Sequence, residues 1–259
     1  MAERERSMKQ DIVMIAVGIA ILSAGCGSSI NSLKARRQRA EAQYKLGVAE
    51  FYTGSYPDAL AALEMARELS PDEAKIYNAL GLIYFKQHKY QQAADAFRRT
   101  LQLDPNFADA HNNLGKVYAQ TGQWDEAIVH YQKALANSFY RTPELAHYNL
   151  GEAFLEKGDN ISAIKEFHTA IQTRPNFSPA LNKYGIALYR MNRNHEAIKR
   201  FNQAIEHSPK FIDPYLNLGI VYMKVDKRAR AVEQFRFVVE HTEDESQLLD
   251  AERYLEMLE

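Results

Sequence analysis

Six glycines recur along the chain at an almost constant interval, and this recurrence restricts the fold more than any other feature of the sequence. They are Gly47, Gly81, Gly115, Gly151, Gly185 and Gly219, separated by 34, 34, 36, 34 and 34 residues. Twelve residues after each glycine stands an alanine: Ala59, Ala93, Ala127, Ala163, Ala197 and Ala231. Four positions later comes a large apolar residue: Leu63, Phe97, Tyr131, Phe167, Phe201 and Phe235. Such a period indicates stacked structural repeats.

The clearest copy of the repeat is Pro105–Leu135, which contains two amphipathic helix patterns. The spacing predicts a first helix over 109–120 and, after a Thr121-Gly122 break, a second helix over 124–135. Residues three and four positions apart share one face of a helix, so each helix carries one apolar stripe. A single helical hairpin cannot bury both stripes. We therefore expect consecutive repeats to pack on one another.

The Leu-Gly pair, the alanine and the aromatic residue resemble the tetratricopeptide repeat, and prolines complete the pattern at Pro71, Pro105, Pro175 and Pro209. The resemblance implies an all-α, right-handed tetratricopeptide-repeat solenoid of six helix pairs, which we place at 41–259 as one domain. We expect glycine and alanine where paired helices approach most closely, and proline where the second helix ends. Apolar residues after the sixth repeat predict a C-terminal capping helix: Leu248, Leu249, Ala251, Tyr254, Leu255 and Leu258.

The first 25 residues have a different character and predict a lipoprotein signal peptide. Ile12–Leu22 is an uncharged apolar run of 11 residues, too short to span a bilayer and suited to a signal-peptide core. Leu22-Ser23-Ala24-Gly25-Cys26 follows and resembles a bacterial lipobox, in which Cys26 would receive the lipid after cleavage behind Gly25. The alternative is an ordinary cysteine near a membrane anchor. Since Cys26 is the only cysteine, it excludes an internal disulfide and a multi-cysteine metal site.

Residues next to the proposed lipidation site suggest where the protein is located. By resemblance to lipoproteins of Gram-negative bacteria, Gly27 implies export to the outer membrane, with the mature chain in the periplasm. Residues 26–40 then form a lipidated tether. The tether contains a basic cluster made of Lys34, Arg36, Arg37 and Arg39. We expect this cluster either to contact lipid headgroups or to form a solvated helical turn. Acidic residues near Met1 also suggest that translation begins at Met8.

The tetratricopeptide-repeat resemblance places a concave groove along the first helix of each pair, at offsets −6, −3, −2, +1, +4 and +5 from the repeat glycine. Two neighbouring offsets hold residues that we predict to bind a partner: Tyr44, Asn78, Asn112, Asn113, Tyr148, Asn149, Asn182 and Asn217. The amides can grip the backbone of an extended peptide, or alternatively satisfy nearby backbone groups of the protein itself. At offset +4 we predict apolar partner contacts from Phe85, Leu155 and Tyr189.

The third interval is two residues longer, and its turn contains Tyr140, Thr142 and Pro143. Together with the lipobox and six repeats, this turn resembles the type IV pilus biogenesis and stability lipoproteins, the PilF/PilW group of pilotins. The resemblance implies a lipid-anchored protein that binds subunits of the outer-membrane secretin and promotes their localisation or assembly. The alternative is a lipid-anchored scaffold for peptidoglycan hydrolases or other envelope-assembly proteins.

Other function classes find no support in the sequence. The chain lacks a glycine-rich phosphate loop, HExxH and GxSxG, and its eight histidines are scattered, so we expect neither an enzyme nor a metal or cofactor site. A formal net charge of −1 gives no overall attraction to nucleic acid. A protein partner remains the expected ligand.

Overall fold

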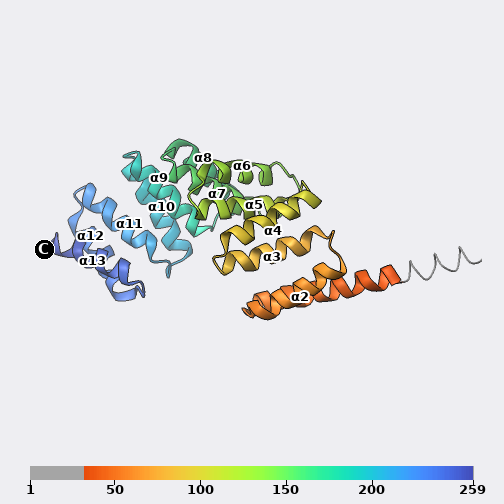
Figure 1. Ribbon diagram of the computed structural model, residues 1–259. Helices are drawn as coiled ribbons and strands as arrows, with labels where there is room; N and C mark the ends of the chain where they lie inside the picture. Colours follow the sequence, from red (N-terminus) through yellow and green to blue (C-terminus); the bar gives the residue numbers. More distant parts are fainter. Residues whose placement is uncertain (1–31, 259) are drawn as a thin grey trace, which may run out of the picture. The chain divides into compact units, whose positions relative to one another are not determined.

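The computed structural model describes residues 32–258, and every regular element assigned among them is a helix. Cys26, Gly27 and the predicted signal peptide lie outside these residues. The chain falls into two compact units, one ending at Asp104 and the other beginning at Pro105, and each contains whole helix pairs (Figure 1). The all-α tetratricopeptide-repeat fold is thereby confirmed. The prediction that 41–259 form a single domain stays a prediction.

Unit 1 contains the first two helix pairs. Residues 32–53 are helical and pair with α2 (Tyr56–Leu69), while α3 (Ala74–Lys86) pairs with α4 (Tyr90–Leu103). The buried side chains of Leu63, Ile76 and Ile83 form its core, and apolar residues of the 32–53 helix pack against them.

Unit 2 contains four helix pairs and a final helix (Figure 1). The pairs are α5 (Ala108–Gln120) with α6 (Trp124–Leu135), α7 (Pro143–Glu156) with α8 (Asn160–Thr173), α9 (Ser178–Arg190) with α10 (Asn194–His207), and α11 (Asp213–Lys224) with α12 (Arg228–His241). The first helices of consecutive pairs, α5, α7, α9 and α11, also contact one another. They therefore form a continuous layer on one side of this unit.

The repeat glycines lie where the two helices of a pair touch. A Cβ atom placed on Gly185 would lie 2.5 Å from the ring of Phe201, and one on Gly115 would lie 2.7 Å from the ring of Tyr131. The other four repeat glycines meet the large residue sixteen positions later in the same way. The periodic pairing of glycine with a large residue in the sequence thus reflects one repeated interhelical contact.

The turn inside each helix pair uses a left-handed backbone conformation seven residues after the repeat glycine. Three of these positions are glycine, with φ between 74° and 85°: Gly54, Gly122 and Gly158. The other three have φ between 57° and 60° although they carry a side chain: His88, Asn192 and Asp226. Asparagine and aspartate tolerate this region because their short polar side chains can bond locally.

The predicted capping helix is present as α13 (Glu245–Glu256). Ala251 is fully buried, and the Tyr254 ring stacks on Phe235 with centroids 4.9 Å apart. Asp244 caps the helix by accepting hydrogen bonds from the backbone N–H groups of Ser246 and Gln247. This helix covers the apolar side chains that a seventh repeat would otherwise bury.

Candidate functional site

A small pocket lies on the first-helix layer of unit 2, where α5, α6 and α7 meet. Its volume is about 250 Å³. Nine residues line it: Lys116, Ala119, Gln120, Trp124, Tyr131, Asn149, Glu152, Ala153 and Glu156. Six of these stand at offsets expected for the groove, so the pocket lies in the groove that the resemblance implied.

The pocket combines an apolar wall with polar groups. The half-buried Trp124, the only tryptophan of the chain, lies with Ala119 and Ala153, while Gln120 and Glu156 are exposed. Amide and carboxylate groups can bond the backbone of a peptide while the apolar wall receives a side chain. Trp124, Gln120 and Glu156 were missed by the sequence reasoning. Being the sole tryptophan was the one available signal for Trp124.

The asparagine rows have a structural role that the sequence left open. Asn149 Nδ2 donates to Asn112 Oδ1 at 3.0 Å, and Asn217 Nδ2 donates to Asn182 Oδ1 at the same distance. In both pairs the asparagine at offset −2 reaches the residue at offset −3 of the preceding repeat. Asn112 and Asn182 are only 7% and 2% exposed. The expectation that their side chains face a partner is therefore corrected, because they connect neighbouring repeats instead.

The prediction that Leu155 contacts a partner is corrected in the same way. It is 1% exposed and belongs to the core cluster that contains Phe167 and Leu188, so its side chain cannot reach a partner in this conformation. The other two residues predicted to make apolar partner contacts, Phe85 and Tyr189, are partly exposed. The Phe85 ring packs on Tyr90 with centroids 5.8 Å apart, and the Tyr189 ring lies 4.7 Å from the Lys224 ammonium.

Tyr148 belongs to a polar cluster beside the pocket. Its ring packs on Phe167 and Phe177, and burial, with a contribution from the Glu152 carboxylate, raises the pKa of its hydroxyl above the usual value. Glu152 in turn pairs with Lys183 at 2.9 Å. These contacts fix the orientation of Glu152 at the edge of the pocket.

In unit 1, Tyr44 has an analogous environment. The Lys75 ammonium lies 5.0 Å from the Tyr44 ring and pairs with Glu41 at 2.6 Å. Burial raises the pKa of Tyr44, and hydrogen bonding to Lys75 lowers the pKa of the Glu41 carboxyl. Asn78 of unit 1 is partly exposed, and so is Asn113 of unit 2.

The long turn between α6 and α7 places two neighbouring aromatic residues in opposite environments. Tyr140 is 9% exposed and packs against Ala108, Ala134 and Ala146, and burial raises its pKa to about 12. The neighbouring Phe139, which the sequence reasoning did not single out, is 90% exposed. Tyr140 is therefore the anchor of this turn, and Phe139 is its exposed side chain.

Within residues 32–258, no helix is both long enough and apolar enough to cross a bilayer. The same part of the chain holds no group of three or more His, Cys, Asp or Glu side chains that could bind a metal ion.

Comparison with known proteins agrees with this geometry. Stacked helix pairs with a groove on the first helices define a protein-interaction module. Sequence profiles of the tetratricopeptide repeat match residues 38–106, 78–141, 145–177 and 185–226. The chain belongs to the tetratricopeptide-repeat family. No curated protein sequence matches it significantly.

Several solved structures share the fold. Pseudomonas aeruginosa PilF is 17% identical, with a TM-score of 0.76 over 85% of this chain and 99% of its own. PilW, described as a widely conserved type IV pilus biogenesis factor, is 20% identical, with a TM-score of 0.76 over 81% and 96%. YrrB, described as having an unusual peptide-binding site, is 22% identical, with a TM-score of 0.59 over 74% and 98%. At these identities the likeness establishes the fold.

Proposed function

We propose that the chain is a pilotin, anchored by lipid on Cys26 to the periplasmic face of the outer membrane. In this role it binds a subunit of the outer-membrane secretin and assists its localisation and assembly in type IV pilus biogenesis. The observation that carries the proposal is the groove pocket of unit 2, with Trp124 as an apolar wall and Gln120, Asn149 and Glu156 as polar groups. The lipobox-like sequence supports the lipid anchor, and the likeness in fold to PilF and PilW supports a role in type IV pilus biogenesis.

The pocket suits an extended or helical segment of the partner. Asn149 donates from Nδ2 to Asn112, and its Oδ1 is an acceptor in a pocket that the exposed Gln120 amide also lines. Recognition of a segment along stacked helices depends on many modest contacts, each on the order of 1 kcal/mol. Single groove substitutions should therefore weaken partner binding without abolishing it.

A matched pair of charge reversals tests the groove. Glu156→Lys changes an exposed carboxylate of the pocket, whereas Glu126→Lys changes an exposed carboxylate of α6 that does not line it. We expect Glu156→Lys to weaken binding to purified secretin subunit and to reduce secretin multimers in outer membranes, and Glu126→Lys to do neither. Equal effects of the two reversals would contradict a role for the pocket.

Deletion and anchoring experiments test the rest of the proposal. Loss of the gene should reduce secretin multimers and surface pili, and normal levels of both would refute the pilotin role. Cys26→Ser should abolish incorporation of labelled palmitate and release the chain from outer-membrane fractions. If affinity capture recovers peptidoglycan hydrolases in place of secretin, the envelope scaffold is the correct function.

A further inference from the structure

The turn between α6 and α7 exposes one aromatic side chain. Phe139 has the largest exposed fraction, 90%, among the large hydrophobic residues of the described chain. Asn137 holds the turn from both sides, because its Nδ2 donates to the Asn106 carbonyl at 2.9 Å and its Oδ1 accepts from the Phe139 N–H at 2.9 Å. The next residue, Tyr140, is buried. Phe139 is thus exposed by a well-anchored turn, and the exposed Arg141 lies two residues away.

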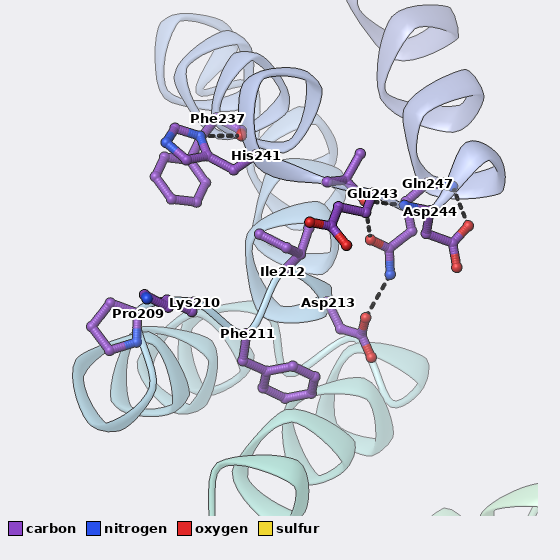
Figure 2. Close-up of a pocket in the computed structure, with 11 residues that line it drawn as sticks. Pro209, Lys210, Phe211, Ile212, Asp213, Phe237, His241, Glu243, Asp244 and Gln247 are labelled. Atoms are coloured by element: carbon purple, nitrogen blue, oxygen red, sulfur yellow. Dashed lines mark hydrogen bonds between the residues drawn. The ribbon is translucent and has the colours of Figure 1, made fainter.

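The same unit contains a cleft whose chemistry complements this turn. The cleft lies where the α10–α11 turn, the end of α12 and the start of α13 meet, and its volume is about 600 Å³. Figure 2 shows that apolar side chains of Phe211, Ile212 and Phe237 and carboxyl groups of Asp213, Glu243 and Asp244 line it. This volume is within the range of pockets that receive organic ligands.

Contacts within the protein hold the cleft in shape. The Phe237 ring lies between the rings of Tyr215 and His241, with centroid distances of 4.0 and 4.1 Å. Gln247 Nε2 donates to Asp213 Oδ1 at 2.7 Å, which joins α13 to the start of α11. Lys210 also lines the cleft, but the three carboxylates outnumber it, so the cleft favours a cationic partner.

We propose that the cleft binds the α6–α7 turn of a second copy of this chain. Phe139 of one copy would enter the apolar part of the cleft of the other, and Arg141 would face Glu243 and Asp244. An aromatic residue in a preformed pocket and a neighbouring ion pair are the usual components of such a contact. The two surfaces lie at different places on unit 2, so the contact is head-to-tail and can extend to further copies. Neither surface includes a residue of the groove pocket, so self-association leaves that pocket free.

Photo-crosslinking in cells tests the proposal on the full-length chain. The photoreactive analogue p-benzoylphenylalanine replaces Phe139, and an equivalent replacement of Tyr52, which is 82% exposed in unit 1, serves as the matched control. We expect illumination to join two copies through position 139, with the crosslinked peptide of the second copy lying within residues 209–247. Tyr52 should give no crosslink to that segment.

Charge reversal supplies a second readout. Glu243→Lys should reduce the crosslinked dimer about 3- to 10-fold, since it replaces a favourable charge contact by a repulsive one. Adding Arg141→Glu to the same chain should restore the dimer. The proposal is overturned if position 139 gives no crosslink, if it crosslinks only to another protein, or if the double reversal restores nothing. Secretin multimers are not part of this readout, so its failure leaves the pilotin proposal untouched.

Discussion

The asparagine pairs lead to a prediction that separates a structural from a binding role. Asn182 is 2% exposed and its Oδ1 accepts from Asn217 Nδ2 at 3.0 Å. Asn217→Ala would leave this buried acceptor without its donor, which costs about 1–3 kcal/mol. Asn182→Ala would leave the half-buried Asn217 amide within reach of water, so its cost is about 1–2 kcal/mol, arising from lost packing and the lost bond.

The double variant should be less destabilised than the sum of the two single variants. A net hydrogen bond of this kind is worth about 0.5–1.5 kcal/mol, and this is the coupling energy that we expect. Urea unfolding followed by circular dichroism measures all four proteins. As a control, Asn202→Ala removes an exposed amide that donates to the Ile198 carbonyl of its own helix, and it should be additive with Asn217→Ala.

Two outcomes would refute this reasoning. Additivity of the Asn182→Ala and Asn217→Ala effects would show that the bond makes no contribution to stability. A loss of partner binding by Asn182→Ala at unchanged stability would return this side chain to the binding surface, as the sequence first suggested.

Two further predictions concern repeated features of the fold. Gly185→Ala should lower the free energy of unfolding by about 1–3 kcal/mol, because its Cβ would lie 2.5 Å from the buried Phe201 ring. The control, Gly158→Asn, changes a turn residue with φ of 81° and no heavy atom within 4 Å of an added Cβ, so it should lower this free energy much less. A smaller loss for Gly185→Ala than for Gly158→Asn in thermal unfolding would contradict this reasoning. Burial lowers the pKa of His111 below its ordinary 6.5, so near this pH the unfolded chain binds more protons than the folded chain. The free energy of unfolding should therefore keep its full value above about pH 6.5 and decrease below it. His111→Tyr introduces the residue that two other repeats carry at this offset, Tyr77 and Tyr215, and urea unfolding between pH 5 and 8 should then show a weaker decline. An unchanged pH dependence would exclude His111 as its source.

The sequence predicted the repeat itself with little error. Helices expected over 109–120 and 124–135 are observed at Ala108–Gln120 and Trp124–Leu135. This succeeds because helical periodicity, the contact between the repeat glycine and a large residue, and the proline stops are local features that lie within single repeats. The capping helix followed from the same periodicity.

The candidate site was less predictable. Asn149 lines the pocket, but Asn182 and Leu155 are buried, and no pattern distinguished them from partly exposed residues at the same offsets. Their burial depends on which side chains the preceding and following repeats place beside them. Sequence offsets specify a face of a helix and say nothing about how deeply a neighbouring repeat covers that face.

The amino-acid sequence alone determined that this chain is a series of paired helices ending in a cap, because each repeat encodes its own interhelical contact. Only the tertiary structure decided which side chains remain available to a partner. In the folded chain Asn112 and Asn182 make hydrogen bonds between repeats, while at the long turn Tyr140 is buried and Phe139 is exposed. The physical reason is that burial and hydrogen bonding at these positions arise from contacts between repeats, which no single repeat specifies.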